Sequence, residues 1–279
     1  MADTYEFEAI GTHWWLELLD GGDFTDSLRQ QIDHTVAQFD QRYSRFRDDS
    51  LVSELYRTGA LSHPPAEMLR MLDFAKEMYE ASGGAFDITV GNTLHKFGYG
   101  KRTIAKKRQT NNFWQEIVIT PAEIRYPDGV MLDFGGFGKG WLIDQLVRDL
   151  KLAGKQQFIV NGGGDIYVQA KDPVRFVLED PTEVGRSVGH VDIANGALAG
   201  SDTIKRAWQD GDKRKHHIID PHTDDSSVTG VVGSYVIAQS ALIADTMATI
   251  LILRPGLEQK LKQEFNLQTI LITRENLDA

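Results

Sequence analysis

Residues 239–253 read Gln-Ser-Ala-Leu-Ile-Ala-Asp-Thr-Met-Ala-Thr-Ile-Leu-Ile-Leu and contain the longest apolar run of the chain. Nearly every residue after Ser240 is apolar or small, so a helix formed here is apolar on all sides. Such a helix belongs in a core, with the rest of the chain packed around it. We therefore expect a buried central helix near the end of the chain.

Asp245 lies in the middle of this apolar stretch, and Thr249 follows one helical turn later. Helix positions four apart share a face, so a carboxylate and a hydroxyl would point the same way. A buried carboxylate is costly unless it is paired or binds a metal. A single Asp in a helix is more often a cap or an ion-pair partner than a metal ligand. The stretch alone leaves these alternatives open.

Composition excludes several classes of protein. The 279 residues are 41% hydrophobic and 25% charged, which is ordinary for a soluble globular chain. A formal net charge of −10 argues against a nucleic-acid-binding protein, because such proteins usually carry a basic face. The absence of cysteine excludes disulfides, thiolate metal sites and thiol nucleophiles.

The N-terminal residues contain no basic start, apolar core or lipidated cysteine, so we expect no secretory signal. The run from Ala241 to Leu253 is interrupted by Asp245 and is too short to cross a bilayer. These features predict a cytoplasmic protein without membrane insertion.

Helical and strand-like segments are mixed without strict alternation, which is typical of α+β proteins with a largely antiparallel sheet. We find no repeat and no linker, and expect one domain over residues 1–279. The spacing of apolar residues predicts helices over 26–39, 51–56, 65–81, 141–152 and 239–253. It predicts a strand over 7–19 that is broken by Gly11, and strands over 116–120, 123–126, 130–134, 158–161, 174–178, 188–193, 197–200, 216–219 and 231–238. Two further segments, 257–265 and 269–273, close the chain.

Two glycine-rich segments follow predicted strands. Residues 135–140 (Gly-Gly-Phe-Gly-Lys-Gly) lead into a helix, and residues 161–165 read Asn-Gly-Gly-Gly-Asp. Glycine lets the backbone approach a phosphate closely, and a helix N-terminus favours negative charge. The first segment is neither a Walker P-loop nor a dinucleotide fingerprint. A tight turn required by packing is the alternative for each.

Other polar segments have simpler interpretations. The basic segments 42–50 and 101–109 are expected to be solvated loops. His216 and His217 would point to opposite faces of a strand, which makes them poor joint metal ligands. Either could move a proton near pH 7. We expect His216 to be an ordinary surface residue.

Taken together and in order, seven segments resemble the ApbE family of FAD:protein FMN transferases over nearly the whole chain. They are residues 10–12, 44–50, 84–91 with 97–100, 132–140 with Asp144, 161–165, 217–221, and 244–245 with Thr249. The resemblance implies a fold related to the T-fold, one flavin site and a Mg²⁺ site. It implies transfer of FMN from FAD to a Thr or Ser hydroxyl of a partner flavoprotein, with release of AMP.

The resemblance also implies roles for particular residues. Asp245 and Thr249 match side-chain metal ligands, Gly136 matches a backbone-carbonyl ligand, and His217 matches the proposed catalytic histidine. The positions that match FAD contacts, including Ile10 where the family usually has Met, are Ile10, Phe46, Ala85, Phe86, Asp87, Asp133, Lys139 and Ile219.

Physical chemistry agrees with this assignment. Cleaving a pyrophosphate requires stabilisation of charge on phosphate oxygens, which Mg²⁺ supplies. Mg²⁺ takes oxygen ligands and keeps several waters, so a carboxylate, a hydroxyl and a carbonyl suffice beside the substrate. His217 is a candidate base or orienting group for the attacking hydroxyl.

Two departures from the family pattern stand out. Asp202 follows Gly200-Ser201 where the family has Gly, and Phe46 replaces a frequent Tyr. The Asp could alter a phosphate contact or the acceptor groove. Two further functions therefore stay open beside the transferase. One is a Mg²⁺-dependent FAD pyrophosphatase, and the other is a non-catalytic FAD-binding protein.

Overall fold

The computed structural model describes residues 3–99, 113–127, 129–211 and 213–274. The predicted basic loop 101–109 lies outside these ranges. The chain forms two compact units. Unit 1 comprises Met1–Phe39, Gly135–Lys205 and Thr229–Ala279, and unit 2 comprises Asp40–Phe134 and Arg206–Val228. The expectation that residues 1–279 form one domain stays a prediction.

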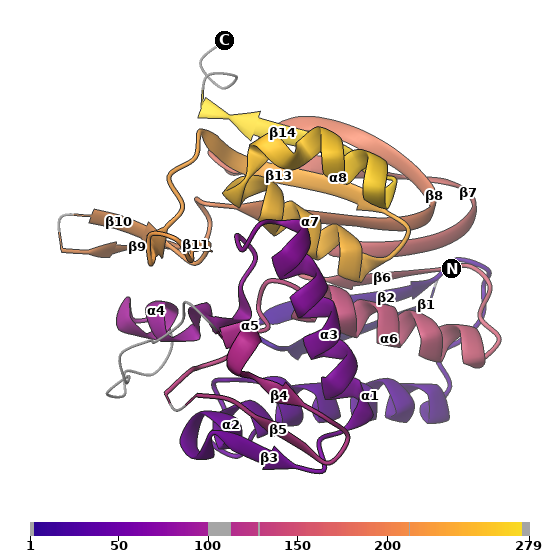
Figure 1. Ribbon diagram of the computed structural model, residues 1–279. Helices are drawn as coiled ribbons and strands as arrows, with labels where there is room; N and C mark the ends of the chain where they lie inside the picture. Colours follow the sequence, from indigo (N-terminus) through magenta and orange to yellow (C-terminus); the bar gives the residue numbers. More distant parts are fainter. Residues whose placement is uncertain (1–2, 100–112, 128, 212, 275–279) are drawn as a thin grey trace. The chain divides into compact units, whose positions relative to one another are not determined.

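Unit 1 is built on a seven-stranded sheet in the order β1-β2-β6-β7-β8-β13-β14 (Figure 1). Every pair of neighbouring strands is antiparallel, which confirms the predicted α+β class with a largely antiparallel sheet. The strands are β1 (Asp3–Ala9), β2 (Thr12–Leu18), β6 (Phe158–Gly162), β7 (Asp165–Glu179), β8 (Ser187–Asp202), β13 (Val231–Ala238) and β14 (Gln268–Thr273).

The predicted first strand over 7–19 is in fact a hairpin. Ile10 and Gly11 separate β1 from β2 and have φ values of 43° and 78°. Positive φ at both central residues is the geometry of a type I′ hairpin turn. Glycine adopts it readily, whereas a β-branched residue such as Ile10 is strained there. The break expected at Gly11 is confirmed, and the segment expected as one interrupted strand is a hairpin because the chain reverses at this turn.

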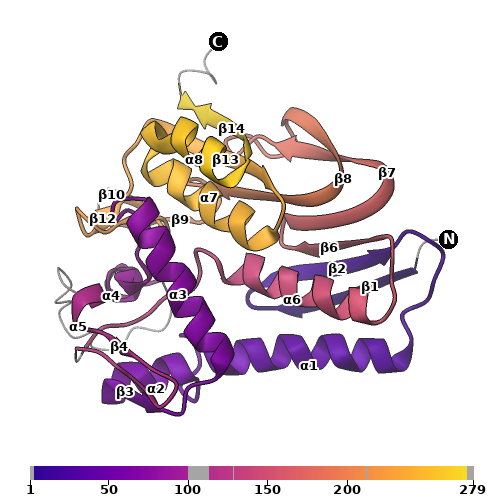
Figure 2. The same ribbon diagram turned by 45° about the vertical axis from the view of Figure 1, so that its right-hand side comes forward.

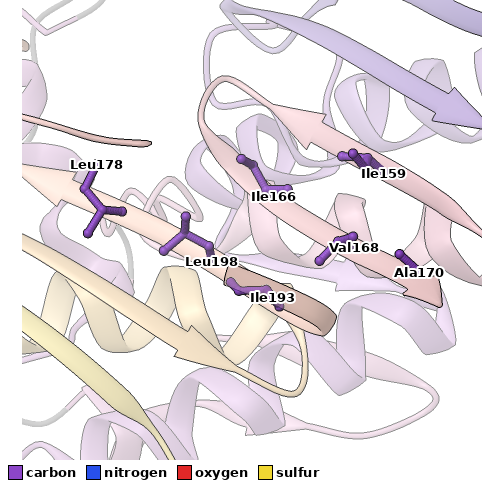
Figure 3. Close-up of a cluster of buried hydrophobic side chains, with 7 residues drawn as sticks. All are labelled: Ile159, Ile166, Val168, Ala170, Leu178, Ile193 and Leu198. Atoms are coloured by element: carbon purple, nitrogen blue, oxygen red, sulfur yellow. The ribbon is translucent and has the colours of Figure 1, made fainter. Parts of the chain in front are cut away.

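The long strands β7 and β8 pair with each other and contribute most of one buried hydrophobic cluster of unit 1. Their register shifts between Gln169 and Val174. Three shorter expected strands (174–178, 188–193 and 197–200) are parts of these two. Side chains from both strands form this cluster with β6 (Figure 3), comprising Ile159, Ile166, Val168, Ala170, Leu178, Ile193 and Leu198.

Three helices of unit 1 lie on one side of its sheet: α6 (Gly138–Leu152), α7 (Ala241–Leu253) and α8 (Glu258–Phe265) (Figure 2). The central helix α7 confirms the prediction for the opening stretch, since ten of its residues are buried. Its N-terminus is capped by Ser240, whose hydroxyl accepts a hydrogen bond from the Ile243 amide at 3.3 Å. A short 3₁₀ turn, Pro255–Leu257, connects α7 to α8.

Unit 2 contains short helices, a small sheet and two hairpins. The helices are α2 (Leu51–Thr58), α3 (Ala66–Ala81), η1 (Ile88–Val90), α4 (Gly91–Lys96) and α5 (Phe113–Glu116). Helix α1 (Asp26–Tyr43) begins in unit 1 and ends in unit 2. The sheet has the order β3-β5-β4, with β3 (Ala60–Ser62), β4 (Val118–Ile119) and β5 (Glu123–Arg125). The hairpins pair β9 (Ala207–Asp210) with β10 (Lys213–His216), and β11 (Ile219–Asp220) with β12 (Asp225–Ser226).

Two further expectations are corrected by the structure. Residues 130–134 are not a strand, since the Met131 amide donates to the Asn92 side chain and the Asp133 amide donates to the Ile88 carbonyl. His217 lies in a bend between β10 and β11 rather than on the strand expected over 216–219.

Within the described part of the chain, no helix combines the length and the apolar character that a membrane crossing requires.

Candidate functional site

Asp245 lies at the centre of a buried polar cluster in unit 1. Its side chain is 4% exposed, and its Oδ2 accepts a hydrogen bond from the Gly140 amide at 2.9 Å. Its Oδ1 lies 3.9 Å from Nζ of Lys139. The Gly140 amide belongs to the first turn of α6, so the Asp245 carboxylate caps that helix and also lies within ion-pair distance of Lys139. One face of α7 therefore presents a charge inside the core.

The amide of Gly140 can reach Asp245 because helices α6 and α7 approach closely at this glycine. A Cβ atom at Gly140 would lie 2.4 Å from the Ala241 carbonyl oxygen. No side chain fits at that distance, so the helix crossing requires glycine here. The last glycine of segment 135–140 is explained by packing, and that packing also fixes the orientation of the Asp245 carboxylate.

Lys139 forms a buried ion pair with Asp165, the first residue of β7. The side chains of Lys139 and Asp165 are 17% and 2% exposed. The other carboxylate oxygen of Asp165 accepts a hydrogen bond from the Gly200 amide of β8 at 3.1 Å. Lys139 lies in the first turn of α6, where the helix dipole disfavours a cation. The neighbouring carboxylates compensate for this unfavourable position.

Thr249 occupies the face of α7 that carries Asp245. Its hydroxyl lies 3.3 Å from the hydroxyl of Ser201, which is near the end of β8. Asp245, Thr249 and Ser201 together offer one carboxylate and two hydroxyls, which are the hard oxygen donors that Mg²⁺ accepts. The donor types therefore fit the predicted cation. Among the residues that the structure describes, no three Asp, Glu or His side chains gather as a metal site.

Gly136, the predicted backbone ligand, lies in the turn that leads into α6. It precedes Gly138, where α6 begins, and Lys139 follows in the first helical turn. The helix was expected to begin only at residue 141. The earlier start places Lys139 and Gly140 on α6 itself, so their positions are fixed by the helix.

Ile10 lies in the turn before β2, and the first residue of β2, Thr12, packs against a second hairpin turn in unit 1. Strand β2 pairs with β6, and the second turn, Gly163-Gly164, joins β6 to β7. A Cβ atom at Gly163 would lie 2.3 Å from Oγ1 of Thr12, so glycine is needed where the turns meet. Gly163 and Gly164 have φ values of 67° and 98°. The glycines of segment 161–165 therefore have a structural reason, which favours the tight-turn interpretation for this run.

Asp144 is a second buried carboxylate, at the N-terminus of α7. Its two oxygens accept hydrogen bonds from the amides of Ala241 at 2.9 Å and Leu242 at 3.0 Å. Burial raises the pKa of Asp144 to about 6, although both amides act to lower it. Asp144 therefore ties α6 to the start of α7, the helix that carries Asp245.

In unit 2, Arg45 connects two predicted site residues, Phe46 and Asp133. It forms an ion pair with Asp133, with side chains 5% and 11% exposed. Its guanidinium lies over the Phe46 ring, 4.2 Å from the centroid. The expectation of a solvated loop was wrong for this arginine, because a carboxylate and an aromatic ring enclose it.

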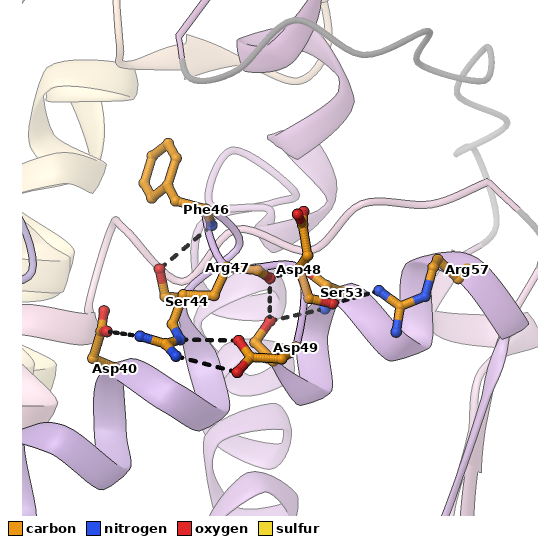
Figure 4. A network of polar contacts seen from close by, with 9 residues as sticks. Asp40, Ser44, Phe46, Arg47, Asp48, Asp49, Ser53 and Arg57 are labelled. Carbon is orange, nitrogen blue, oxygen red and sulfur yellow. Dashed lines mark hydrogen bonds and ion pairs between the residues drawn. The ribbon is translucent and has the colours of Figure 1, made fainter.

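The loop that carries Phe46 is held by the polar network of Figure 4. Arg47 binds both oxygens of Asp49, at 3.1 and 3.2 Å, and one oxygen of Asp40 at 3.2 Å. The hydroxyl of Ser53 donates to the Arg47 carbonyl at 2.6 Å. These contacts fix the backbone, whereas the Phe46 side chain points away from them and is half-exposed.

Tyr99 joins this arginine to the predicted catalytic histidine. The Arg45 guanidinium donates to the Tyr99 carbonyl at 3.0 Å, and the Phe46 ring meets the Tyr99 ring edge-on at 6.2 Å. Tyr99 stacks on Trp208 of β9 at 5.6 Å and on His217 at 6.2 Å. Unit 2 therefore brings Phe46, Asp133 and His217 into one contiguous aromatic and charged cluster.

The remaining predicted contacts in unit 2 have largely buried side chains. Ala85, Phe86 and Ile219 are 1%, 4% and 4% exposed, so each residue is almost completely buried. Asp87 caps the short helix η1, and its Oδ1 accepts from the Thr89 amide at 2.9 Å and hydroxyl at 2.8 Å. Their contacts with FAD stay predictions.

Two expectations about individual side chains are revised. His216 is 8% exposed and its Nε2 lies 2.9 Å from the Ser227 carbonyl, so it is a buried structural residue rather than a surface one. The Oδ1 of Asp202 accepts hydrogen bonds from the amides of Ile204 at 2.8 Å and Lys205 at 2.6 Å. Asp202 therefore caps the turn after β8.

The prediction from sequence missed four residues of these clusters, namely Asp165, Arg45, Tyr99 and Trp208. Asp165 ends a glycine run and Arg45 precedes Phe46, so each adjoined a segment already singled out. Trp208 carried no such signal, because its stacking on Tyr99 joins residues more than one hundred positions apart.

Solved structures share this fold across almost the full chain. The ApbE protein of Thermotoga maritima matches with a TM-score of 0.85 and 20% identity, covering 99% of this chain and 95% of its own. The flavin transferase ApbE of Vibrio cholerae matches with a TM-score of 0.79 and 21% identity, covering 98% and 94%. These likenesses confirm the predicted ApbE-like fold.

Sequence comparisons agree with the fold. The FAD:protein FMN transferase of Haemophilus influenzae is 24% identical over 96% of this chain and 85% of its own length. The Escherichia coli K12 protein of the same name is 25% identical over 97% and 84%. The family model for the ApbE family matches residues 10–268. This chain belongs to the ApbE family.

Proposed function

We propose that the protein transfers FMN from FAD to a Thr or Ser hydroxyl of a target flavoprotein in a Mg²⁺-dependent reaction that releases AMP. The names of its relatives support flavin transfer to a protein. The observation that carries the proposal is the buried Asp245 carboxylate, with the Thr249 hydroxyl on the same helix face and the Lys139 ammonium 3.9 Å away.

Asp245 and Thr249 are the proposed side-chain ligands of Mg²⁺, with the Gly136 carbonyl as a backbone ligand. When bound, Mg²⁺ would neutralise charge on the pyrophosphate oxygens. Ser201 shares a hydrogen bond with Thr249 and would orient its hydroxyl. Lys139 would supply a second positive charge to the phosphates. Its ion pair with Asp165 keeps it in a defined position.

The reaction joins the acceptor hydroxyl oxygen to the phosphorus of the FMN half of FAD. The bond from that phosphorus to the bridging oxygen breaks, and AMP leaves with that oxygen. The hydroxyl proton must go to a base, and we assign this role to His217. The stacked ring of Tyr99 supports one face of the imidazole and would restrict its orientation.

The rings of FAD require flat apolar surfaces. The half-exposed Phe46 ring, backed by the Arg45 guanidinium, is the proposed stacking residue in unit 2. Ile10, Asp133 and Lys139 are further proposed contacts, as are the backbones of Ala85, Phe86, Asp87 and Ile219.

One experiment separates this function from its alternatives. The protein is incubated with FAD, Mg²⁺ and a flavoprotein acceptor of an ApbE transferase, with the same acceptor lacking its target hydroxyl as control. Covalent flavin fluorescence on the intact acceptor alone, together with AMP, supports the transferase. AMP without labelled acceptor would instead indicate an FAD pyrophosphatase. FAD retained without either product would indicate a binding protein.

A further inference from the structure

Three charged side chains meet inside unit 1: Lys139 of α6, Asp165 of β7 and Asp245 of α7. Lys139 forms its ion pair with Asp165, and its Nζ lies 3.9 Å from Oδ1 of Asp245. The two carboxylate side chains are only 2% and 4% exposed. The lysine therefore lies within reach of both carboxylates but is in close contact with one.

Further hydrogen bonds hold the Asp165 carboxylate in place beside the Lys139 ammonium. Its second oxygen accepts the Gly200 amide of β8 at 3.1 Å. The turn that precedes it is closed by the Asn161 side chain, whose Oδ1 accepts the Gly164 amide at 2.9 Å. Two strands and one turn therefore determine where the Asp165 carboxylate lies, and through it the position of the ammonium.

We propose that Asp165 is a positioning residue that keeps the Lys139 ammonium off the Asp245 carboxylate and so leaves this carboxylate available to a divalent cation. The inference rests on the cation site of the proposed function. Lysine is a compact charge on a flexible stem, so we expect it to move to the nearest carboxylate when its partner is lost. Without the Asp165 charge, that carboxylate is Asp245.

An ammonium bound to Asp245 would compete with the cation for the same oxygens. Removing the Asp165 charge is therefore expected to weaken cation binding through Lys139, although Asp165 is not itself a ligand. Removing Lys139 as well takes away the competitor. This dependence on a second residue distinguishes competition from general damage to the fold.

The test measures Mn²⁺ binding to the full chain by the electron paramagnetic resonance signal of free Mn²⁺, without FAD or acceptor. Asp165→Asn keeps an oxygen for the Gly200 amide, and we expect it to bind Mn²⁺ about 10-fold more weakly than the parent chain. Asp165→Asn with Lys139→Met is expected to return close to the parent affinity. Unchanged affinity in Asp165→Asn, or no recovery in the double variant, would overturn the proposal.

A crystal structure of metal-free Asp165→Asn separates repositioning from a change in overall charge. We expect Lys139 Nζ in direct contact with an Asp245 oxygen, closer than the 3.9 Å of the parent chain. A lysine that keeps its parent position would contradict the proposal. Asp245→Asn serves as the reference, because parent binding no tighter than this variant would refute the cation site itself. Asp165→Asn with parent affinity, while Asp245→Asn loses binding, would refute the positioning role alone.

Discussion

The ammonium of Lys139 lies 3.9 Å from the Asp245 carboxylate, on the first turn of a helix that also donates the Gly140 amide to the same carboxylate. A cation and an anion at this separation inside a core interact strongly without forming a close pair. The close crossing of α6 and α7 at Gly140 brings the two backbones together, since a Cβ there would lie 2.4 Å from the Ala241 carbonyl oxygen. The ammonium itself is held by its ion pair with Asp165.

Thr249 should contribute through its hydroxyl rather than its shape. Thr249→Val keeps the branched side chain and removes the oxygen beside Ser201, so we expect Mg²⁺-dependent AMP release to require at least about 10-fold more Mg²⁺. Thr249→Ser keeps the oxygen and is expected to stay close to the parent chain. Equal Mg²⁺ dependence of the two variants would remove Thr249 from the set of ligands.

His217 should affect proton transfer and leave FAD binding in place. His217→Asn is expected to slow flavin transfer by about 100- to 10,000-fold, the range of general acid–base contributions. The FAD dissociation constant, measured by flavin fluorescence, should change little. The matched control is His222→Asn, since His222 is an exposed histidine on the same unit. A His217→Asn enzyme with the turnover of this control would contradict the assignment.

Arg45 should matter for stability, because it neutralises a carboxylate away from water. Arg45→Met removes the ion pair with the largely buried Asp133 carboxylate and is expected to lower the free energy of unfolding by about 3–5 kcal/mol. Arg175→Met breaks an exposed ion pair with Asp192 and should cost less than about 1 kcal/mol. Urea unfolding measures both values. Equal effects of the two substitutions would show that burial does not strengthen the Arg45 pair.

The Asp144 carboxylate should lower the free energy of unfolding as the pH rises. Its pKa is raised from 3.8 to about 6, so the folded chain binds the proton more tightly than the unfolded chain. The stabilisation from this group is complete below the unfolded pKa and is lost as pH rises through about 6. The change amounts to about 3 kcal/mol.

The contribution of Asp144 is isolated by comparison with Asp144→Asn. The free energy of unfolding of the parent minus that of the variant should fall between about pH 4 and pH 7. A difference that stays constant, or that rises over this range, would show that burial does not raise the Asp144 pKa. The measurement uses urea unfolding at several pH values in one buffer series.

The sequence predicts the elements that depend on local pattern. Helix α7 and strand β13 (Val231–Ala238) lie where apolar periodicity places them, and α3 ends at the predicted Ala81. Segment 7–19 was predicted as a strand broken by Gly11, and not as a hairpin, because Ile10 is a poor residue for a turn with positive φ. The pairing of β1 with β2 across this break forms the hairpin.

The candidate site was predictable only in part. Asp245 and Thr249 share a helix face as their spacing requires, and Lys139 lies beside Asp245. Lys139 of helix α6 pairs with Asp165 of strand β7, and Asp133 pairs with Arg45, 88 positions away. Such pairings depend on tertiary packing, so helix and strand periodicity could not indicate them.

The central claim is that Asp245 holds the divalent cation on which flavin transfer depends. Asp245→Asn keeps an oxygen for the Gly140 amide and removes the negative charge, so the fold should persist while cation binding fails. Its matched control is Asp192→Asn, which removes an exposed carboxylate from β8 of the same unit. Circular dichroism verifies that both variants are folded.

The most direct measurement is covalent flavin fluorescence on the acceptor protein as a function of Mg²⁺ concentration, for the parent chain and both variants. We expect saturable Mg²⁺-dependent labelling by the parent and by Asp192→Asn. We expect at least about 100-fold slower labelling by Asp245→Asn at every Mg²⁺ concentration. Parent-like labelling and Mg²⁺ dependence in a folded Asp245→Asn protein would show that Asp245 does not hold the cation.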